Sequence, residues 1–481
     1  VLDRLNRMKV VIIGNGIAGI EAALALRQRE ASAQITIVSE ESDHLFSRTA
    51  LLYVLVGQLR HADMEPHERD LYARHGFQRV RARALGLDLA GRRVLLAGGL
   101  PPLPYDRLLL ACGSSPRPAP WPGAGLRGVG HFVSLSDLAW LEEELYGGAG
   151  RGGPPPRPTE HHGRSAEGSP YLPRPSARAQ RGRAPREVAV IGGGLIGIEL
   201  VEAMLAAGYR PHFLVRESWF WPMAIDAGES AFVAEALRAH GVTMHLECEV
   251  AALEGDGALE GEGLVSGIRL AGGRLLPAEL VAVAIGVVPN TGWLRGSGLE
   301  LDPGSGGLCV DAGLRCSDEA VWAAGDCAAV QGPEGRRPEQ LWYTARDQGR
   351  AVAGSMLGEA KPYRRGPEYN SAKLMDIEYT TAGTVERGQP GLWSFRLEEQ
   401  GPVRSSTRIC CQGARVVGFN LLGRRWDHSV LLAWIEQQRS LGWVLEHLDE
   451  ARFDTELVPP LRIPVDALER AREDASARAA G

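Results

Sequence analysis

The sequence predicts an α/β protein built on two parallel β-sheets, each covered by helices, with an α+β segment near the C-terminal end. Two glycine patterns of the form G-x-G-x-x-G predict the sheets. The first closes the apolar run 10–13 and opens a helical pattern, and the second does the same after the apolar run 188–191, roughly one domain further along the chain. From about residue 363 the pattern changes to strands at 392–397, 405–411 and 414–421, followed by helical stretches around 429–439 and 442–448. A glycine pattern between a strand and a helix is typical of dinucleotide-binding folds.

The first pattern contains Gly14, Gly16 and Gly19, with Ile17 and Ala18 between the last two. A Cβ at Gly14 or Gly16 would obstruct either the tight turn or the close approach of a pyrophosphate. Gly19 allows the helix to pack closely on the strand. The N–H groups and the dipole of the helix N-terminus favour an anion there. We therefore expect these residues to bind a dinucleotide.

The next strand, 34–39, ends at Glu40. A carboxylate at this place can accept hydrogen bonds from both hydroxyls of an adenosine ribose. The alternative is that Glu40 and Glu41 form a solvated loop after the strand. The order of glycines and acid favours the ribose role.

The second pattern contains Gly192, Gly194 and Gly197, with Leu195 and Ile196 before the third glycine. The same backbone reasons apply, so a second dinucleotide is expected to bind at the same time. Two such sites in one chain are the basic plan of a flavoprotein that takes hydride from NAD(P)H.

Strand 211–215 after the second pattern is followed by Arg216 and Glu217. Arg216 can pair with a 2′-phosphate and favour NADPH, whereas Glu217 can hold a 2′-hydroxyl and favour NADH. The two choices are close to even, with a slight preference for NADH because such enzymes use it more often. Glu199, in the helix between pattern and strand, is a further candidate binding residue.

With both patterns in place, the chain resembles the FAD-dependent pyridine nucleotide-disulphide oxidoreductase family from about Lys9 to about Gly383. The most similar branch holds NADH oxidases, ferredoxin and rubredoxin reductases and the flavin portion of nitrite reductase large subunits. Four further segments carry the resemblance. They are 105–118, with Ala111 and Gly113; 284–290, with Gly286; 321–328, with Gly325 and Asp326; and 344–350. In the family, 105–118 leaves the FAD domain, 284–290 re-enters it, and 344–350 starts a helix that faces the flavin.

The resemblance implies that Asp326 holds the ribityl chain of FAD. A carboxylate after an apolar strand can also accept such a hydrogen bond on chemical grounds, and an additional role as the N-cap of a following helix is compatible with this.

The resemblance also implies two Rossmann-like, three-layer domains, the NAD(P) domain inserted in the FAD domain, and a C-terminal interface domain that forms a homodimer. The expected regions are 8–125 and 287–365 for FAD, 126–286 for NAD(P)H, 366–466 for the interface and 467–481 for a tail. Within the second region, 147–185 is crowded with Gly, Pro, Arg and Ser and has few residues able to build a core. We expect a flexible insertion there, or alternatively a segment that docks a partner.

Many members of this family carry a redox-active cysteine, and this chain departs from that pattern. Thr49 occupies the place of the nucleophile, and neither C-x-x-C nor C-x-x-x-x-C occurs in the sequence. Without a thiolate, disulphide reductase and peroxidase activities are not expected. Arg48 resembles an arginine near the FAD pyrophosphate in the electron-transferring reductases; the alternative is a surface arginine.

Composition is that of an ordinary globular protein: 481 residues, a net charge of −6 and 23% charged residues. This excludes a strongly basic nucleic-acid-binding protein. No apolar run approaches the roughly 18 residues needed to span a membrane. The N-terminal residues are too polar for a secretion signal, so the cytoplasm is expected. The seven cysteines are scattered or, at Cys410 and Cys411, adjacent, which predicts no metal site and fits a reducing compartment.

We therefore expect an NAD(P)H-dependent FAD oxidoreductase. No side chain is assigned a catalytic role, because the cofactor carries the chemistry and the protein places it. The acceptor is expected to be a protein, such as an iron–sulphur protein or a partner subunit, or a small molecule such as a quinone or dye; a protein is the first choice and dioxygen the second. The remaining alternative is a non-catalytic flavin-binding subunit or redox sensor.

Overall fold

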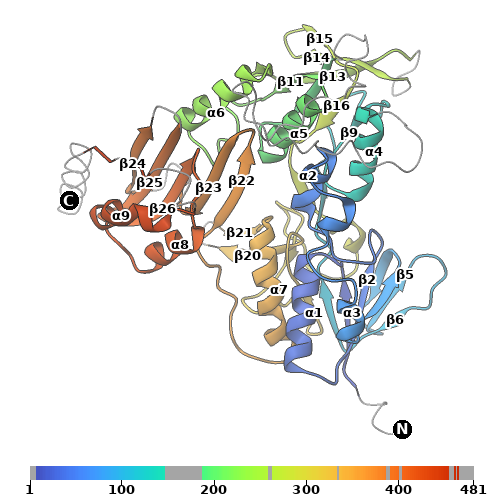
Figure 1. Cartoon of the computed structure of the whole chain (residues 1–481). Coiled ribbons are helices and arrows are strands. Elements are labelled where there is room, and N and C mark those ends of the chain that lie inside the picture. The colour runs from blue at the N-terminus through green and yellow to red at the C-terminus, as the bar shows by residue number, and fades with distance from the viewer. Residues whose placement is uncertain are drawn as a thin grey trace. The chain divides into compact units, whose positions relative to one another are not determined.

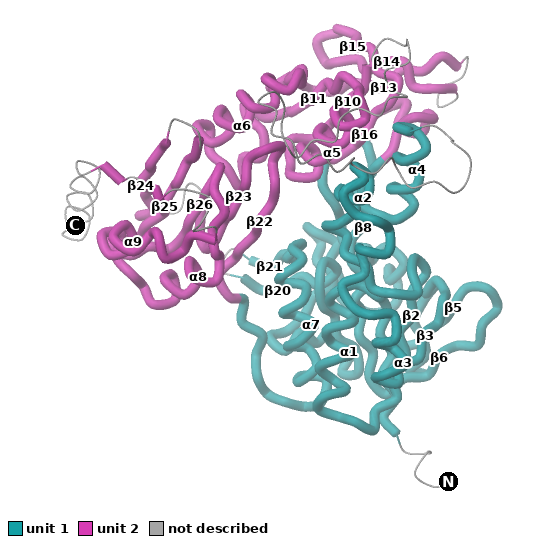
Figure 2. Tube along the Cα trace, in the orientation of Figure 1, with its two compact units in different colours: residues 1–119, 131–158, 285–365 teal, residues 120–130, 159–284, 366–481 magenta. Residues whose placement is uncertain are grey.

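The computed structural model describes residues 7–146, 187–257, 263–332, 335–385, 390–399, 404–453, 460–461 and 463–464. The predicted insertion at 147–185 and the tail at 467–481 lie outside these residues. The chain divides into two compact units (Figure 2): unit 1 is 1–119, 131–158 and 285–365, and unit 2 is 120–130, 159–284 and 366–481. The segment 131–146 thus belongs to unit 1. The five regions expected from the sequence remain predictions at their boundaries.

Unit 1 is built on a five-stranded sheet in the order β19-β7-β1-β2-β3, and every neighbouring pair is parallel. Its strands are β1 (Lys9–Ile13), β2 (Gln34–Ser39), β3 (Gln78–Arg81), β7 (Arg107–Leu110) and β19 (Val321–Ala323). Near-continuous apolar runs such as Val10–Ile13 are buried, as expected for strands covered on both faces.

Helices α1 (Ile17–Arg29) and α7 (Trp342–Met356) lie side by side in this unit (Figure 1). Small residues allow the close approach: a Cβ added at Gly349 would lie 2.4 Å from the carbonyl oxygen of Ala18. This contact fixes the N-terminal half of α1 against α7, which comes from the far end of the unit's sequence.

Shorter elements complete unit 1. The helices are α2 (Leu51–Leu55), α3 (Leu71–Arg74) and α4 (Leu135–Tyr146). Three small sheets pair β4 (Ala84–Asp88), β5 (Arg93–Leu96) and β6 (Leu103–Pro104); β8 (Ser114–Pro116) and β17 (Val287–Pro289); and β18 (Leu308–Cys309), β20 (Ala328–Gly332) and β21 (Gly335–Pro338).

Unit 2 contains a second five-stranded parallel sheet, in the order β12-β11-β10-β16-β9. Its strands are β9 (Val129–Gly130), β10 (Glu187–Ile191), β11 (Arg210–Leu214), β12 (Thr243–His245) and β16 (Val281–Val283). Helices α5 (Leu195–Ala206) and α6 (Ala227–Ala239) belong to it, with an antiparallel sheet of β13 (Val250–Gly255), β14 (Val265–Leu270) and β15 (Leu275–Pro277).

The rest of unit 2 is an antiparallel sheet in the order β22-β23-β26-β25-β24, with two helices. The elements are β22 (Tyr369–Leu374), β23 (Ile377–Gly383), β24 (Leu392–Glu399), β25 (Ser405–Gln412), β26 (Arg415–Leu422), α8 (His428–Glu436) and α9 (Leu441–His447). The α/β class, the two parallel sheets and the α+β C-terminal part are confirmed.

A buried ion pair connects α6 to this antiparallel sheet. Arg408 on β25 donates to both carboxylate oxygens of Glu229, at 2.8 and 2.9 Å, and Asn420 donates to Glu229 at 2.9 Å. Glu229 is fully buried and Arg408 is 3% exposed. Because a buried charge is tolerated only with such partners, this pair ties the two parts of unit 2 together.

Cys410 and Cys411 are both buried on β25, beside a register shift of the strand. Cys411 belongs to the apolar core between sheet and helices, whereas Cys410 lies next to Arg408. Both are thus buried in different surroundings, as expected for ordinary buried residues.

Candidate functional site

The strands of the first sheet end in the residues that the sequence singled out. Gly14 follows β1, Glu40 follows β2, Ala111 and Gly113 follow β7, and Asp326 follows β19. Because all pairs are parallel, these ends share one edge of the sheet. Ligands of open α/β sheets bind at this edge.

The three glycines of the first pattern are required for different reasons. Gly14 has a φ of +117°, and a Cβ there would lie 2.0 Å from the carbonyl oxygen of Ala111. A Cβ at Gly19 would lie 2.2 Å from the carbonyl oxygen of Gly14. A Cβ at Gly16, the N-cap of α1, would meet nothing within 4 Å. The fold therefore does not need Gly16; the open space over the helix N-terminus is the space that a pyrophosphate requires.

The second pattern repeats this geometry in unit 2. Gly192 has a φ of +122°, and a Cβ at Gly197 would lie 2.0 Å from its carbonyl oxygen. A Cβ at Gly194, the N-cap of α5, would meet nothing within 4 Å. Leu195 and Ile196 are the first two residues of α5, directly after this N-cap. Both patterns thus leave the same space for an anionic group.

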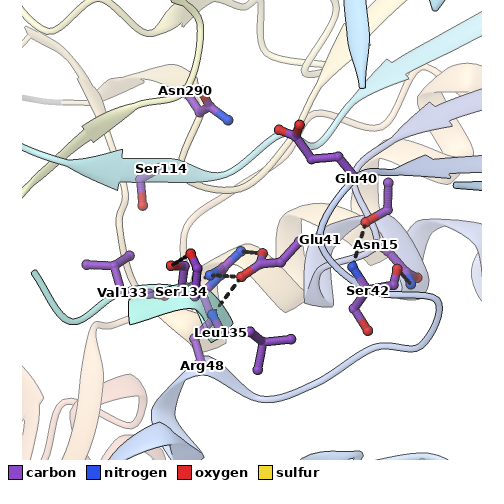
Figure 3. Close-up of polar contacts among 12 residues, drawn as sticks. Asn15, Glu40, Glu41, Ser42, Arg48, Ser114, Val133, Ser134, Leu135 and Asn290 are labelled. Atoms are coloured by element: carbon purple, nitrogen blue, oxygen red, sulfur yellow. Dashed lines mark hydrogen bonds and ion pairs between the residues drawn. The ribbon is translucent and has the colours of Figure 1, made fainter. Parts of the chain in front are cut away.

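Glu40 is exposed at the end of β2, and its carboxylate lies 3.7 Å from the guanidinium of Arg83. Its exposure leaves the carboxylate accessible for hydrogen bonds from a ribose, and Figure 3 draws no contact between Glu40 and the other residues shown. Glu41 behaves differently, because it pairs with Arg48 and accepts the Leu135 N–H at 3.0 Å. The view of both acids as a solvated loop is therefore wrong for Glu41.

Arg48 lies just before α2, with its guanidinium turned toward Glu41 (Figure 3). It also donates to the carbonyl oxygen of Val133, at 2.7 Å. These contacts join the start of α2 to the segment before α4. The phosphate role of Arg48 stays a prediction, and it requires that Arg48 share its donors with Glu41.

Asp326 accepts a hydrogen bond of 2.6 Å from the Ser114 hydroxyl. Burial raises the pKa of the Asp326 carboxyl, while the Ser114 hydrogen bond and the charge of Arg48 act in the opposite direction. Strand β20, not a helix, follows Asp326, so the additional N-cap role is wrong. Its position at the sheet edge suits a ribityl hydroxyl.

Sequence reasoning missed two polar partners of this edge, Ser114 and Gln348. Gln348 is fully buried on α7, accepts the Gly325 N–H at 2.7 Å and donates to Glu339 at 2.8 Å. Gly325 itself has a φ of +78°. The side chain from α7 thus fixes the turn that presents Asp326. Gln348 lay inside the family-like segment 344–350, which was the only signal for it.

The segments with Gly113 and Gly286 lie against each other. Gly113 has a φ of +68° and Gly286 one of +98°. The strands that follow them, β8 and β17, pair antiparallel, and the Asn290 N–H donates to the Gly113 carbonyl oxygen at 2.9 Å. Both glycines therefore serve turns where the chain leaves and re-enters unit 1.

Glu199 lies on α5, one turn from the N-terminal end of that helix. Burial and the neighbouring charge of Glu202 raise the pKa of Glu199 from its ordinary 4.5 to about 8. At neutral pH its carboxyl group is therefore mostly protonated and can donate a hydrogen bond. Such a shifted group beside a nucleotide-binding turn is a functional-site candidate.

Arg216 and Glu217 follow β11 and pair with each other at 2.9 Å. Arg216 is exposed and lines a cavity of about 730 Å³, whose wall comes from the residues after β11 and β12 and from the β14–β15 turn. Among the residues described, no group of three or more His, Cys, Asp or Glu side chains is placed to hold a metal ion.

Comparisons with known proteins identify the family of this chain. The family model of the pyridine nucleotide-disulphide oxidoreductases matches residues 8–349. Rhodocoxin reductase of Rhodococcus erythropolis is 28% identical, covering 88% of each chain. A probable ferredoxin reductase of Castellaniella defragrans is 27% identical, covering 80% of this chain and 86% of its own.

Solved structures show the same fold. A ferredoxin reductase from Rhodopseudomonas palustris superimposes with a TM-score of 0.74 at 23% identity, covering 92% of this chain and 99% of its own. A putidaredoxin reductase, solved in covalent complex with putidaredoxin, also gives 0.74, at 21% identity, and covers 98% of this chain and 100% of its own.

The chain belongs to the pyridine nucleotide-disulphide oxidoreductase family. It is an NAD(P)H-dependent flavin oxidoreductase that uses FAD. Within the described parts of the chain, no helix is long and apolar enough to cross a membrane.

Proposed function

We propose that this chain is the reductase of an electron-transfer system, which takes hydride from NAD(P)H onto FAD and passes electrons to a small iron–sulphur protein or a partner subunit. The observation that carries the proposal is the paired geometry at Gly16 and Gly194, where the backbone leaves open the space that a pyrophosphate needs. Relatives named as ferredoxin and rubredoxin reductases support a protein acceptor.

Residues at the edge of the first sheet would bind FAD, and residues at the edge of the second would bind NAD(P)H. Glu40 would accept from the adenosine ribose of FAD, the Gly14–Gly19 turn would hold its pyrophosphate, and Asp326, steadied by Ser114, would accept from the ribityl chain. The turn at Gly192–Gly197 would hold the pyrophosphate of NAD(P)H. Bound FAD supplies the hydride-accepting and one-electron chemistry, so no acid or base from the chain is needed for the first step.

The sequence supports a protein acceptor over a disulphide. Thr49 stands where the single-cysteine enzymes of the family carry their nucleophile, and its hydroxyl lies 2.8 Å from that of Ser47. A threonine hydroxyl cannot exchange with a disulphide. Electrons must then leave the flavin directly.

An anaerobic titration of the flavin-loaded protein with NADH and then NADPH, followed by visible absorption, tests the proposal. Bleaching by at least one nucleotide is expected. A plant-type [2Fe–2S] ferredoxin added to the reduced protein should then be reduced faster than dioxygen on readmission of air. Reoxidation by air alone would favour an oxidase, and no bleaching would leave a non-catalytic flavin subunit.

We also propose that the protein is a homodimer in the cytoplasm. All seven cysteines are unpaired, which supports a reducing compartment. Sedimentation velocity on the flavin-loaded chain should give a species of twice the mass, and a monomer at every concentration would contradict the dimer.

A further inference from the structure

The two parallel sheets can be aligned residue by residue through one shared hydrogen bond. In unit 1 the Gly14 N–H donates to the carbonyl oxygen of Val38 at 2.8 Å, and in unit 2 the Gly192 N–H donates to that of Leu214 at 2.9 Å. Both are the first glycine of their pattern, and both acceptors lie at the end of the adjacent parallel strand. Val38 and Leu214 therefore occupy the same place in the two folds.

The residue two positions later is the one expected to face the ribose. In unit 1 this residue is Glu40, and in unit 2 it is Arg216. Glu217 corresponds to Glu41, whose carboxylate pairs with Arg48. The position that would bind a 2′-hydroxyl in NADH thus carries a guanidinium, which is suited to a phosphate.

Arg216 opens onto the cavity of about 730 Å³, and a second arginine, Arg274, lines it from the β14–β15 turn. Ser218 adds a hydroxyl to the same wall. Two carboxylates, Glu247 and Glu249, also line the cavity; they repel an anion, whereas the two arginines attract it. Arg216 and Arg274 are both exposed, so the guanidinium donors other than those that bond Glu217 and His245 are accessible.

A chain of hydrogen bonds fixes Arg274 at this wall. Arg274 donates to Nδ1 of His245 at 3.0 Å, Nε2 of His245 lies 3.0 Å from Nδ1 of His212, and Nε2 of His212 lies 3.3 Å from Glu187. Because a guanidinium has no acceptor, Nδ1 of His245 must accept, and its Nε2–H must donate to His212. The Nε2–H of His212 then points to the Glu187 carboxylate, which accepts.

This arrangement leaves the positive charge of Arg274 facing the cavity. Burial, His212 and Arg274 lower the pKa of His245 to about 4, so the ring that contacts Arg274 is neutral at physiological pH. The carboxylate at the end of the chain, Glu187, is separated from Arg274 by two imidazole rings. In this series of hydrogen bonds the direct partner of Arg274 is a neutral imidazole and not a carboxylate, so its positive charge is available to an anion in the cavity.

We propose that the cavity binds the adenosine end of NADPH, that Arg216 and Arg274 pair with its 2′-phosphate, and that the chain therefore uses NADPH in preference to NADH. This inference deepens the proposed function and rests on it for the identity of the ligand. Glu217 acts as the partner that holds Arg216 in place when no nucleotide is bound.

The first test measures binding without turnover. Calorimetric titration of the flavin-loaded protein with 2′,5′-ADP and with 5′-AMP isolates the 2′-phosphate, and we expect 2′,5′-ADP to bind at least about tenfold tighter. Arg216→Gln and Arg274→Gln should each weaken 2′,5′-ADP about ten- to a hundredfold, the size of a lost charge-assisted hydrogen bond, and leave 5′-AMP nearly unchanged. Arg238→Gln, at an exposed arginine on α6, is the matched control and should change neither.

Equal binding of the two probes, or an equal loss for both in Arg216→Gln, would overturn the inference. The flavin-reduction titration separates this failure from that of the proposed function. Reduction by NADH with no preference for a 2′-phosphate would keep the reductase and remove the NADPH site. Selective binding of 2′,5′-ADP to a protein whose flavin neither nucleotide reduces would keep the site and remove the reductase.

Discussion

Replacing Glu199 with glutamine should make the protein more stable at high pH and leave its stability unchanged at low pH. Glu199 lies on α5 with a pKa raised from 4.5 to about 8 by burial and by Glu202. A carboxyl group whose pKa is raised in the folded state keeps a proton that the unfolded chain loses. Between these two pKa values, the folded state therefore loses stability as the pH rises. Glutamine has no proton to lose in either state.

The size of the effect follows from the gap between the two pKa values. One pKa unit corresponds to about 1.4 kcal/mol. The free energy of unfolding of Glu199→Gln should therefore gain on the order of 2–5 kcal/mol over that of the wild type above about pH 8, and nearly nothing at about pH 4. For a domain of this size, that is a rise of roughly 5–15 °C in the midpoint of thermal unfolding.

Thermal unfolding of the flavin-loaded wild type and the Glu199→Gln variant, from about pH 5 to about pH 9, measures the difference. The difference between the two unfolding midpoints should widen from about pH 5 to about pH 8 and then level off. Glu143→Gln, at an exposed glutamate on α4, is the control and should give parallel curves. A gap that is constant with pH, or that narrows as pH rises, would refute the reasoning.

Three further predictions concern binding and stability. Gly16→Val should fold, because a Cβ at this position meets nothing within 4 Å, but it should lower FAD affinity more than about tenfold. Gly19→Val should fail to fold. Circular dichroism and flavin content after purification distinguish the two variants, and a Gly16→Val protein with its full flavin content would contradict the site. Asp326→Asn should weaken FAD binding about tenfold or more, since a neutral amide is a poorer acceptor for a ribityl hydroxyl than a carboxylate. Ser114→Ala should weaken it less, because Ser114 only donates to Asp326. Fluorescence titration measures both, and unchanged FAD affinity in Asp326→Asn would remove the ribityl role. Arg408→Ala should cost about 3–5 kcal/mol of unfolding free energy, because Glu229 is left buried without its cation; Arg404→Ala, at an exposed pair with Glu235, should cost no more than about 1 kcal/mol, and similar losses in denaturant unfolding would show that burial of the Glu229 pair does not matter.

Much of the binding edge in unit 1 could be predicted because its signals are local. The glycine spacing at 14, 16 and 19 fixes a turn among neighbouring residues; the backbone requires glycine at 14 and 19, whereas at Gly16 it leaves open space. Glu40 is identified by its place at a strand end. Local patterns fail where a role depends on the type of the next element: Asp326 looked compatible with a helix N-cap, but strand β20 comes after it.

Contacts between distant parts of the chain could not be predicted. Ser114 and Asp326 are 212 residues apart, and Gln348 reaches Gly325 only because α7 packs beside α1. Arg48 resembled a phosphate ligand, yet its partners Glu41 and Val133 depend on how the segment before α4 folds back. Nothing in the pattern of either segment carries that information.

By itself the sequence determined the α/β class, two strand–turn–helix glycine patterns and the resemblance to a family that uses FAD and NAD(P)H, and it predicts nucleotide binding at both turns and a threonine in place of the family's nucleophile. These depend on backbone conformation and residue type over a few neighbouring positions. The tertiary structure decided that Arg274 lines the same cavity as Arg216, and that burial and Glu202 raise the pKa of Glu199. It also gives Gly192 and Leu214 the same hydrogen bond as Gly14 and Val38, so Arg216 stands at the position of Glu40. Those properties depend on which elements pack together, since burial and charge–charge distances exist only once the chain has folded.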